Sequence, residues 1–151
     1  MLDDRDRAVL RRWQAEPTLS PAELAEVVGL TPAQVARRIE RMTRDGVIRG
    51  QSAVIDWAAL GFPLAVSLRI TLDKTVPNAF DAFLAEARTV AEVLEIQTFL
   101  GRVDVRLSLV ARDLAHYQQV YRDRILALPH IADIEALMDV ASVRDETGLP
   151  L

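Results

Sequence analysis

The chain of 151 residues contains no cysteine, and this absence excludes several kinds of chemistry. Without thiols there is no disulfide framework, no cysteine nucleophile and no thiolate metal site. Histidine is also scarce, since His116 and His130 are the only two. Neither lies in a spacing such as H-E-x-x-H, so a zinc site has little support. We therefore expect neither a metal ion nor a cofactor.

Long apolar runs are missing as well. No stretch of about 18 apolar residues occurs, so we expect no membrane-spanning segment. The first residues are charged and lack the apolar centre of a signal peptide. Half of the residues are nevertheless hydrophobic and 26% are charged, which is typical of a folded, soluble protein. The expected location is the cytoplasm.

The net charge of −4 is unevenly distributed along the chain. Residues 1–50 hold nine Arg against eight acidic residues, whereas residues 51–151 hold nine basic against fourteen acidic residues. Within residues 31–49, five Arg stand against two acidic residues. A local basic patch can bind phosphates even when the whole protein is acidic, so the net charge does not exclude a nucleic-acid partner.

The first fifty residues predict three short helices. The first covers about residues 4–15. The second begins after Ser20, and Glu23 follows three positions later. This spacing is a capping box, in which each side chain satisfies a backbone N–H that the helix leaves unpaired. Gly29 ends the second helix, and the third helix follows after a short turn.

The third helix begins with the same kind of capping box, with Thr31 as its cap and a glutamine three residues later. At 100° per residue, Val35, Ile39 and Met42 share one face. The opposite face carries Gln34, Arg37, Arg38, Arg41 and Arg44. A helix, a turn containing glycine and a second helix form the helix-turn-helix unit, whose second helix enters the major groove of DNA.

We interpret residues 1–50 as a helix-turn-helix DNA-binding domain. The alternative is a small helical bundle whose Arg residues only face solvent. Arg38 is expected to read bases, or else to be a buried partner of an acidic residue, and Arg41 is expected to contact phosphate. We expect the aspartates of the first helix to lie away from the Arg face. The predicted DNA contacts are Thr31, Gln34, Arg37, Arg38, Arg41, Arg44 and Arg49.

Residues 51–62 are predicted to form a linker strand, or wing, and a turn. Residues 63–151 then show alternating and helical periods in the order β-α-β-β-α-β, which is the ferredoxin-like unit. The fold class is therefore α+β, with a winged helix-turn-helix domain before a ferredoxin-like domain. The predicted elements are strands at 64–72, 93–99, 103–109 and 134–140, and helices at 80–87 and 114–128.

One face of the predicted sheet is half apolar and half charged. It carries Arg69, Thr71, Glu95, Gln97, Arg106, Ser108, Val110, Leu137 and Asp139. Such a face suggests packing against a second copy of the chain. The alternative is a sheet face that simply meets solvent, which antiparallel sheets tolerate.

The order and spacing of several motifs resemble the Lrp/AsnC (feast/famine) family of transcriptional regulators. The matching stretches are Leu2-Asp3-x-x-Asp6-x-x-x-Leu10, Glu23-Leu24-Ala25-x-x-Val28-Gly29-Leu30-Thr31, Val35-x-x-Arg38-Ile39-x-Arg41-Met42-x-x-Asp45-Gly46-Val47-Ile48, Gly101-x-x-Asp104, Tyr117 through Leu128-Pro129, and Val143-Arg144. The resemblance implies a sequence-specific regulator that binds double-stranded DNA as a homodimer, in a family whose dimers commonly form octamers. Such a protein works in the cytoplasm, on the nucleoid.

The resemblance also implies a small effector, often an amino acid, between dimers near the Gly-x-x-Asp turn. The corresponding residues are Gly101, Arg102, Val103 and Asp104. The chain departs from the family pattern at Leu100, Ile134 and Ala136, where hydroxyl side chains are common. Two alternatives therefore stay open: the Asp104 carboxylate binds a cationic group of the effector, or it only caps a hairpin.

A second class of function also fits the predicted C-terminal domain. Small ferredoxin-like dimers also serve as enzymes or ligand-binding modules, because a fold does not fix a function. No pair of carboxylates stands in an apolar setting that would tune it for acid–base catalysis. The Arg face of the third helix favours a DNA-binding regulator over an enzyme.

Overall fold

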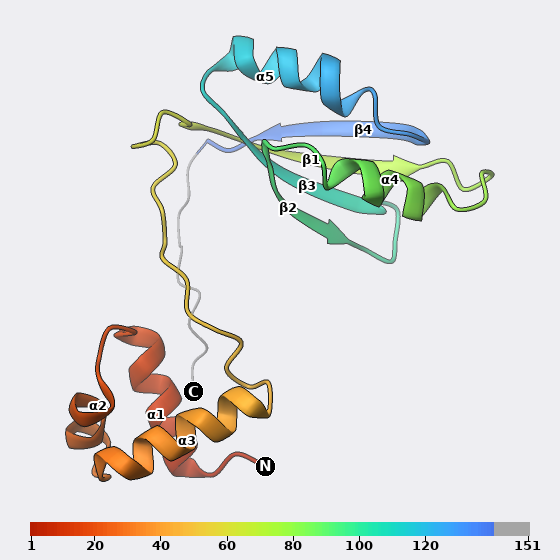
Figure 1. Cartoon of the computed structure of the whole chain (residues 1–151). Helices are drawn as coiled ribbons and strands as arrows, with labels where there is room; N and C mark the ends of the chain where they lie inside the picture. Colours follow the sequence, from red (N-terminus) through yellow and green to blue (C-terminus); the bar gives the residue numbers. More distant parts are fainter. Residues whose placement is uncertain (141–151) are drawn as a thin grey trace. The chain divides into compact units, whose positions relative to one another are not determined.

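The computed structural model describes residues 1–140, which divide into two compact units at residues 54 and 55. The first unit contains the helices of residues 4–44, and the second contains the sheet with the helices that cover it (Figure 1). The boundary falls within the predicted linker, and Val143-Arg144 of the family pattern lies outside the described residues. No helix within residues 1–140 is long and apolar enough to cross a membrane. The elements are α1 (Asp4–Ala15), α2 (Pro21–Val28), α3 (Pro32–Arg44), β1 (Leu64–Leu72), α4 (Ala79–Ala87), β2 (Val93–Thr98), β3 (Val105–Ala111), α5 (Leu114–Val120) with a π-helical turn (Tyr121–Ile125), and β4 (Ile131–Met138).

Each helix of the N-terminal unit begins with a capping box. The Thr31 hydroxyl accepts from the backbone N–H of Gln34 at 3.3 Å, and the Gln34 side chain accepts from the N–H of Thr31 at 3.0 Å. Ser20 and Glu23 make the same exchange at the start of α2. The two boxes and all three helices predicted from the sequence are thereby confirmed.

The three helices pack around a small apolar core. Its fully enclosed members are Val9, Leu24, Ala25, Val35 and Met42. Gly29 ends α2 in the left-handed conformation at φ 66°, which glycine adopts without the cost that a Cβ would bring. The turn thus positions α3 against α1 and α2 with its other side exposed.

The segment between the units differs from the prediction. A strand was expected within residues 51–62, but no strand precedes β1 in the described chain. The predicted turn is present, because the backbone N–H of Phe62 donates to the carbonyl of Trp57 at 2.9 Å. Residues 47–56 do not pair with any strand in the described chain. The β-like pattern of their sequence therefore does not lead to a β-strand.

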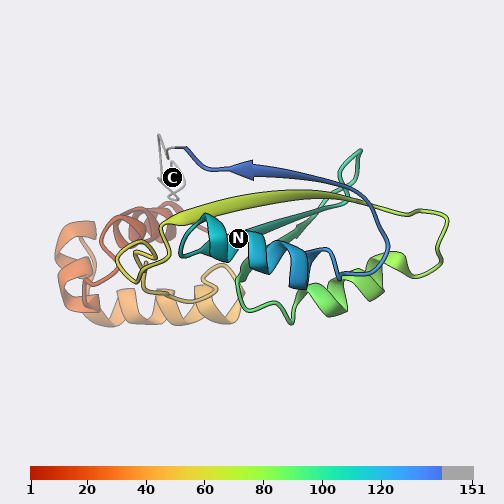
Figure 2. The ribbon, with the colours of Figure 1, turned by 90° about the horizontal axis from the view of Figure 1, so that it is seen from above.

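The C-terminal unit is a four-stranded antiparallel sheet in the order β2-β3-β1-β4. Figure 2 shows β1 running between β4 and β3. Helices α4 and α5 cover one face and enclose the core, which includes Leu68, Ile70, Phe83, Leu107 and Ile125. This arrangement confirms the predicted β-α-β-β-α-β order and the ferredoxin-like class.

Several element ends and one side chain differ from the sequence pattern. β3 begins at Val105, two residues later than predicted, and β4 begins at Ile131, three residues earlier. The helix expected to reach residue 128 is regular only to Val120. Although Phe80 and Phe83 have the i, i+3 spacing of one helix face, Phe80 is 40% exposed and Phe83 is fully enclosed.

Candidate DNA-binding helix and effector pocket

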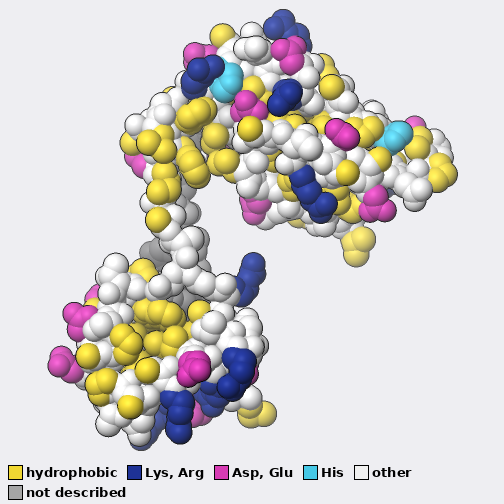
Figure 3. All heavy atoms as spheres, in the orientation of Figure 1, with side chains coloured by type: hydrophobic (Ala, Val, Ile, Leu, Met, Phe, Trp, Pro, Cys, Tyr) yellow, Lys and Arg dark blue, Asp and Glu magenta, His cyan; other side chains and the backbone are white. Residues whose placement is uncertain are grey.

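One side of α3 presents basic and amide groups to solvent. Gln34, Arg37 and Arg44 are exposed, and Arg49 is exposed in the segment that follows. Arg44 has 71% of its side chain exposed and contacts the neighbouring Asp45 carboxylate only at 3.6 Å. Figure 3 shows Lys and Arg side chains gathered on one side of the N-terminal unit. The guanidinium groups of Arg37 and Arg44 can therefore meet a polyanion without first breaking a close ion pair within the described chain.

Arg38 is held inside the unit. Its Nη1 lies 2.9 and 2.8 Å from the two carboxylate oxygens of Asp3 and 2.6 Å from Oδ1 of Asp6. Only 19% of the Arg38 side chain is exposed. These contacts raise the pKa of Arg38 through hydrogen bonds to Asp3 and Asp6. They favour the alternative interpretation of Arg38, as the partner of an acidic residue, while its predicted DNA contact stays untested.

Asp6 is a fully enclosed carboxylate between α1 and α3. Its second oxygen accepts from Nη2 of Arg41 at 2.5 Å, and the backbone N–H of Asp3 donates to the same oxygen at 2.9 Å. Burial raises the pKa of Asp6, but the hydrogen bonds from Asp3, Arg38 and Arg41 outweigh it and hold the pKa below its ordinary value. Asp6 therefore stays ionised at neutral pH.

The expected position of the aspartates was wrong. Asp3 and Asp6 were placed away from the Arg face, yet both bind Arg side chains of α3. The physical reason is the first turn of α1, where Asp3 caps the helix and Asp6 returns the contact, so both carboxylates meet α3. Helical periodicity within α3 alone does not reveal a neighbour that is 32 residues earlier in the chain.

Thr31 and Gln34, also predicted to contact DNA, are engaged in the capping box of α3. The box occupies the amide oxygen of Gln34, so its Nε2 is the end available to a base or phosphate. The predicted DNA contacts Arg37, Arg44 and Gln34 thus lie on the exposed face of one helix, whereas Arg38 and Arg41 lie at its edge against α1.

The sheet face that carries no helix has the mixed character expected from the sequence. Arg69 of β1 lies 3.5 Å from Glu135 of β4, and Arg106 of β3 lies 3.6 Å from Glu95 of β2. These are cross-strand ion pairs, so both signs of charge lie side by side on this face. Leu137 lies on the same face, opposite Ser67, and is half-buried.

The Gly-x-x-Asp turn connects β2 to β3. Asp104 has 15% of its side chain exposed, accepts from the backbone N–H of Leu72 at 2.9 Å, and lies 3.4 Å from Nζ of Lys74. The Arg102 carbonyl accepts from the Thr71 hydroxyl at 2.9 Å. Asp104 therefore closes the end of β1 through Leu72, which differs from the capping of its own hairpin that the sequence suggested, and its second oxygen faces the Lys74 cation.

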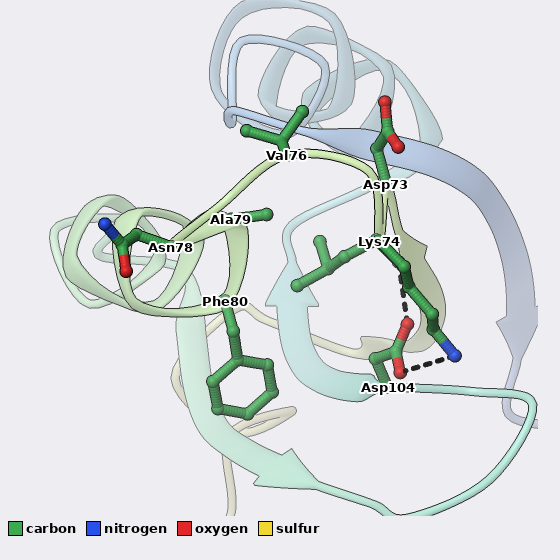
Figure 4. Close-up of a pocket in the computed structure, with 8 residues that line it drawn as sticks. Asp73, Lys74, Val76, Asn78, Ala79, Phe80 and Asp104 are labelled. Atoms are coloured by element: carbon green, nitrogen blue, oxygen red, sulfur yellow. Dashed lines mark hydrogen bonds and ion pairs between the residues drawn. The ribbon is translucent and has the colours of Figure 1, made fainter.

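Asp104 also lines a hollow of about 190 Å³ (Figure 4). Of the four predicted effector residues, Asp104 alone is among its lining residues; Gly101, Arg102 and Val103 are not. Gly101 has no positive φ, and a Cβ there would meet nothing within 4 Å, so the chain by itself does not require glycine. The hollow is lined by Leu72, Asp73, Lys74, Val76, Asn78, Ala79, Phe80 and Asp104.

The chemistry of this hollow combines one ion pair with an apolar wall. Lys74 and Asp104 offer a cation and an anion, and Val76 and Phe80 are among the apolar residues that line the same hollow. Lys74 was missed by the sequence reasoning, although it is the only lysine of the chain. Across residues 1–140, no group of three His, Asp or Glu side chains is placed to hold a metal ion.

Both parts of the chain match known protein families. Residues 2–49 match a family described as winged helix-turn-helix DNA-binding, and residues 65–149 match the Lrp/AsnC ligand binding domain. The proline dehydrogenase transcriptional activator of Rhodobacter capsulatus is 30% identical over 98% of this chain and 96% of that protein. The leucine-responsive regulatory protein of Salmonella typhimurium is 29% identical over 98% and 90% of the two chains.

Solved structures show the same likeness. An AsnC family transcriptional regulator from Agrobacterium tumefaciens aligns with a TM-score of 0.88 at 31% identity, over 99% of this chain and 97% of that one. A transcriptional regulator from Neisseria meningitidis in complex with L-Met aligns with a TM-score of 0.92 at 25% identity, again over 99% and 97%. The likeness therefore extends over both units.

Proposed function

Because the chain belongs to the Lrp/AsnC family of transcriptional regulators, we propose that it reads double-stranded DNA with α3 as a homodimer and responds to a small effector. The observation that supports DNA reading is the exposed face of α3, where Gln34, Arg37 and Arg44 stand free of close internal ion pairs. In a dimer, two such helices meet two half-sites about one helical turn apart.

The DNA-binding proposal is tested with the full chain and a random pool of duplexes. We expect selection of a near-palindromic sequence, a footprint with two-fold symmetry, and affinity that falls steeply with salt. A chain that selects no sequence, or whose footprint lacks two-fold symmetry, contradicts the proposal.

The homodimer is proposed to form through the open sheet face. Its cross-strand pairs, Arg69 with Glu135 and Arg106 with Glu95, place both signs of charge next to half-buried Leu137. A self-complementary mixture of this kind suits an interface between two identical copies. Assembly of dimers into an octamer is the further step implied by the family resemblance, and sedimentation of the purified chain distinguishes the two.

The effector is proposed to be an amino acid or a related small metabolite that binds near residues 101–104, between dimers. The support is the hollow beside Asp104, with a cation and an anion from Lys74 and Asp104 next to an apolar wall. Zwitterionic ligands with an apolar side chain match this combination. The solved relative that holds L-Met makes that amino acid the first probe.

The effector proposal is tested by a thermal-shift screen of amino acids. A shift in the wild type that is lost in Asp104→Ala supports the site. A hit that shifts both proteins equally places the ligand elsewhere, and no hit at all favours a regulator without such an effector.

The proposal assigns no catalytic role, because the compared relatives are transcriptional regulators. The alternative, a ferredoxin-like binding module or small enzyme, gains no support from the described site. A protein that regulates transcription works where the chromosome is, so we propose that it acts in the cytoplasm, on the nucleoid.

A further inference from the structure

The contact between α1 and α3 brings two carboxylates and two guanidinium groups together. Arg38 reaches both Asp3 and Asp6, while Arg41 reaches only Asp6. Asp6 is fully enclosed, whereas 53% of the Asp3 side chain is exposed. We refer to these four residues as the α1–α3 clamp.

The charges of the clamp balance within the unit. A buried charge must be paired and hydrogen-bonded, because removing it from water is costly. Asp6 meets this need with donors from Arg38, Arg41 and the backbone N–H of Asp3. The positive charge of the two Arg side chains is therefore directed inward, against α1, and is largely neutralised before DNA approaches.

The rest of the helix has no comparable constraint. Arg44 has 71% of its side chain exposed, against 39% for Arg41 and 19% for Arg38. Arg37 is exposed, with no ion pair within 4 Å among the described residues. A phosphate gains most from a guanidinium whose charge is not already paired.

We propose that Asp6 is a positioning residue for DNA recognition: it ties Arg38 and Arg41 to α1, so that Arg37 and Arg44 carry the direct contacts of α3 to DNA. The inference rests on the proposed DNA-binding function and sharpens it. The four Arg side chains of α3 thereby fall into two pairs. Arg38 and Arg41 orient the helix, and Arg37 and Arg44 contact the nucleic acid.

The experiment measures binding of the full chain to its selected duplex and to poly(dI-dC) over a range of salt concentrations. Each phosphate contact contributes about 0.9 to the slope of log K against log salt. Arg37→Ala and Arg44→Ala should each reduce a slope by about this amount on poly(dI-dC). Arg38→Ala and Arg41→Ala should leave that slope unchanged and should weaken the preference for the selected duplex.

Asp6→Asn supplies the decisive readout. The change frees Arg41 and leaves Arg38 paired with Asp3 alone, so the slope on poly(dI-dC) should become steeper while the preference for the selected duplex falls. A residue that only supported the fold would lower the active fraction and leave the slope as it is. Asp4→Asn is the matched control, because it removes the same charge from the exposed side of the same helical turn. It should leave the preference for the selected duplex intact.

A second variant keeps the proposal testable if the first one unfolds. If Asp6→Asn melts before DNA can be tested, Asp3→Asn releases only the outer contact of Arg38 and should steepen the slope by a smaller amount. The inference is overturned if Arg38→Ala and Arg41→Ala reduce the slope as Arg37→Ala does. A wild type that selects no duplex would instead remove the proposed function itself.

Discussion

Arg38 on α3 and Asp6 on α1 form an ion pair of 2.6 Å whose carboxylate has no exposed surface. The pair joins the helix expected to enter the major groove to the first helix of the chain. A buried ion pair adds little to the free energy of unfolding compared with an apolar contact of similar size. Removal of only one partner is nevertheless strongly destabilising, because it leaves the other charge buried and unpaired. Orientation of α3 therefore depends on polar residues as well as on the apolar core.

Removing one side of this pair should destabilise the N-terminal unit. Asp6→Asn leaves Arg38 and Arg41 without their shared anion, and we expect a loss of about 3–5 kcal/mol in the free energy of unfolding. Denaturant unfolding followed by the fluorescence of Trp13, which packs against this core, measures the change. Asp4→Asn serves as the control, since an exposed charge should cost less than about 0.5 kcal/mol. Equal stability of the two variants contradicts the expectation.

Stability of the same unit should fall in acid. The pKa values of Asp3 and Asp6 lie below the ordinary 3.8, so their contribution is complete above that pH and is lost as the pH falls through the lower, folded values. Unfolding of the wild type at several pH values between about 5 and 2 should show this decline. In Asp6→Asn the pH dependence should be shallower, and an identical decline would show that other carboxylates cause it.

The open sheet face should control assembly. Leu137→Glu introduces a charge among the cross-strand pairs, and we expect the dimer to weaken at least tenfold, because a desolvated unpaired charge at an interface costs about 2 kcal/mol or more. Analytical ultracentrifugation over a concentration series provides the measurement. Gln119→Glu adds the same charge on the exposed side of α5 and should leave the dimer unchanged. If both variants weaken assembly alike, the interface lies elsewhere.

Asp104 should have two separable roles. Its bond to the N–H of Leu72 supports β1, whereas its contact with Lys74 belongs to the hollow. Lys74→Ala should lower the melting temperature only slightly, since the Lys74 side chain is 66% exposed and an ion pair with an exposed partner contributes about 0–1 kcal/mol. It should nevertheless reduce the shift caused by L-Met. Asp104→Ala should lower both. An L-Met shift that survives in Lys74→Ala removes Lys74 from the site.

The sequence predicted local structure well where the chemistry is local. Ser20 with Glu23, and Thr31 with Gln34, lie three residues apart, so each capping box is visible in the sequence and is confirmed. The alternation in β1 and β3 likewise corresponds to a face that is buried from Val66 to Leu72 and along the whole of β3. Signals of this kind need no knowledge of distant residues.

Contacts between distant residues were predicted poorly. The bonds of Arg38 to Asp3 and Asp6 span more than thirty residues, and an acidic residue in the first turn of a helix is already explained by the helix dipole. The same limit applies to Lys74, which reaches Asp104 from a different loop. The expected strand within residues 51–62 failed because an extended sequence forms a strand only beside a partner strand.

The segment that links the two units forms no strand among the described residues, and this has a consequence for the geometry of the operator. Gln51 still bonds to Pro17 of the first unit, and Asp56 already caps the turn of the second, which leaves residues 52–55 as a short tether. A tether of this length reaches about 13–14 Å at full extension. In the proposed dimer, two DNA-binding units on such tethers would act as a bivalent ligand, and the tether length would set the effective concentration of the second unit once the first is bound. Such a dimer would reach operators with unequal half-site spacing, with avidity that declines as the spacing outgrows the tether.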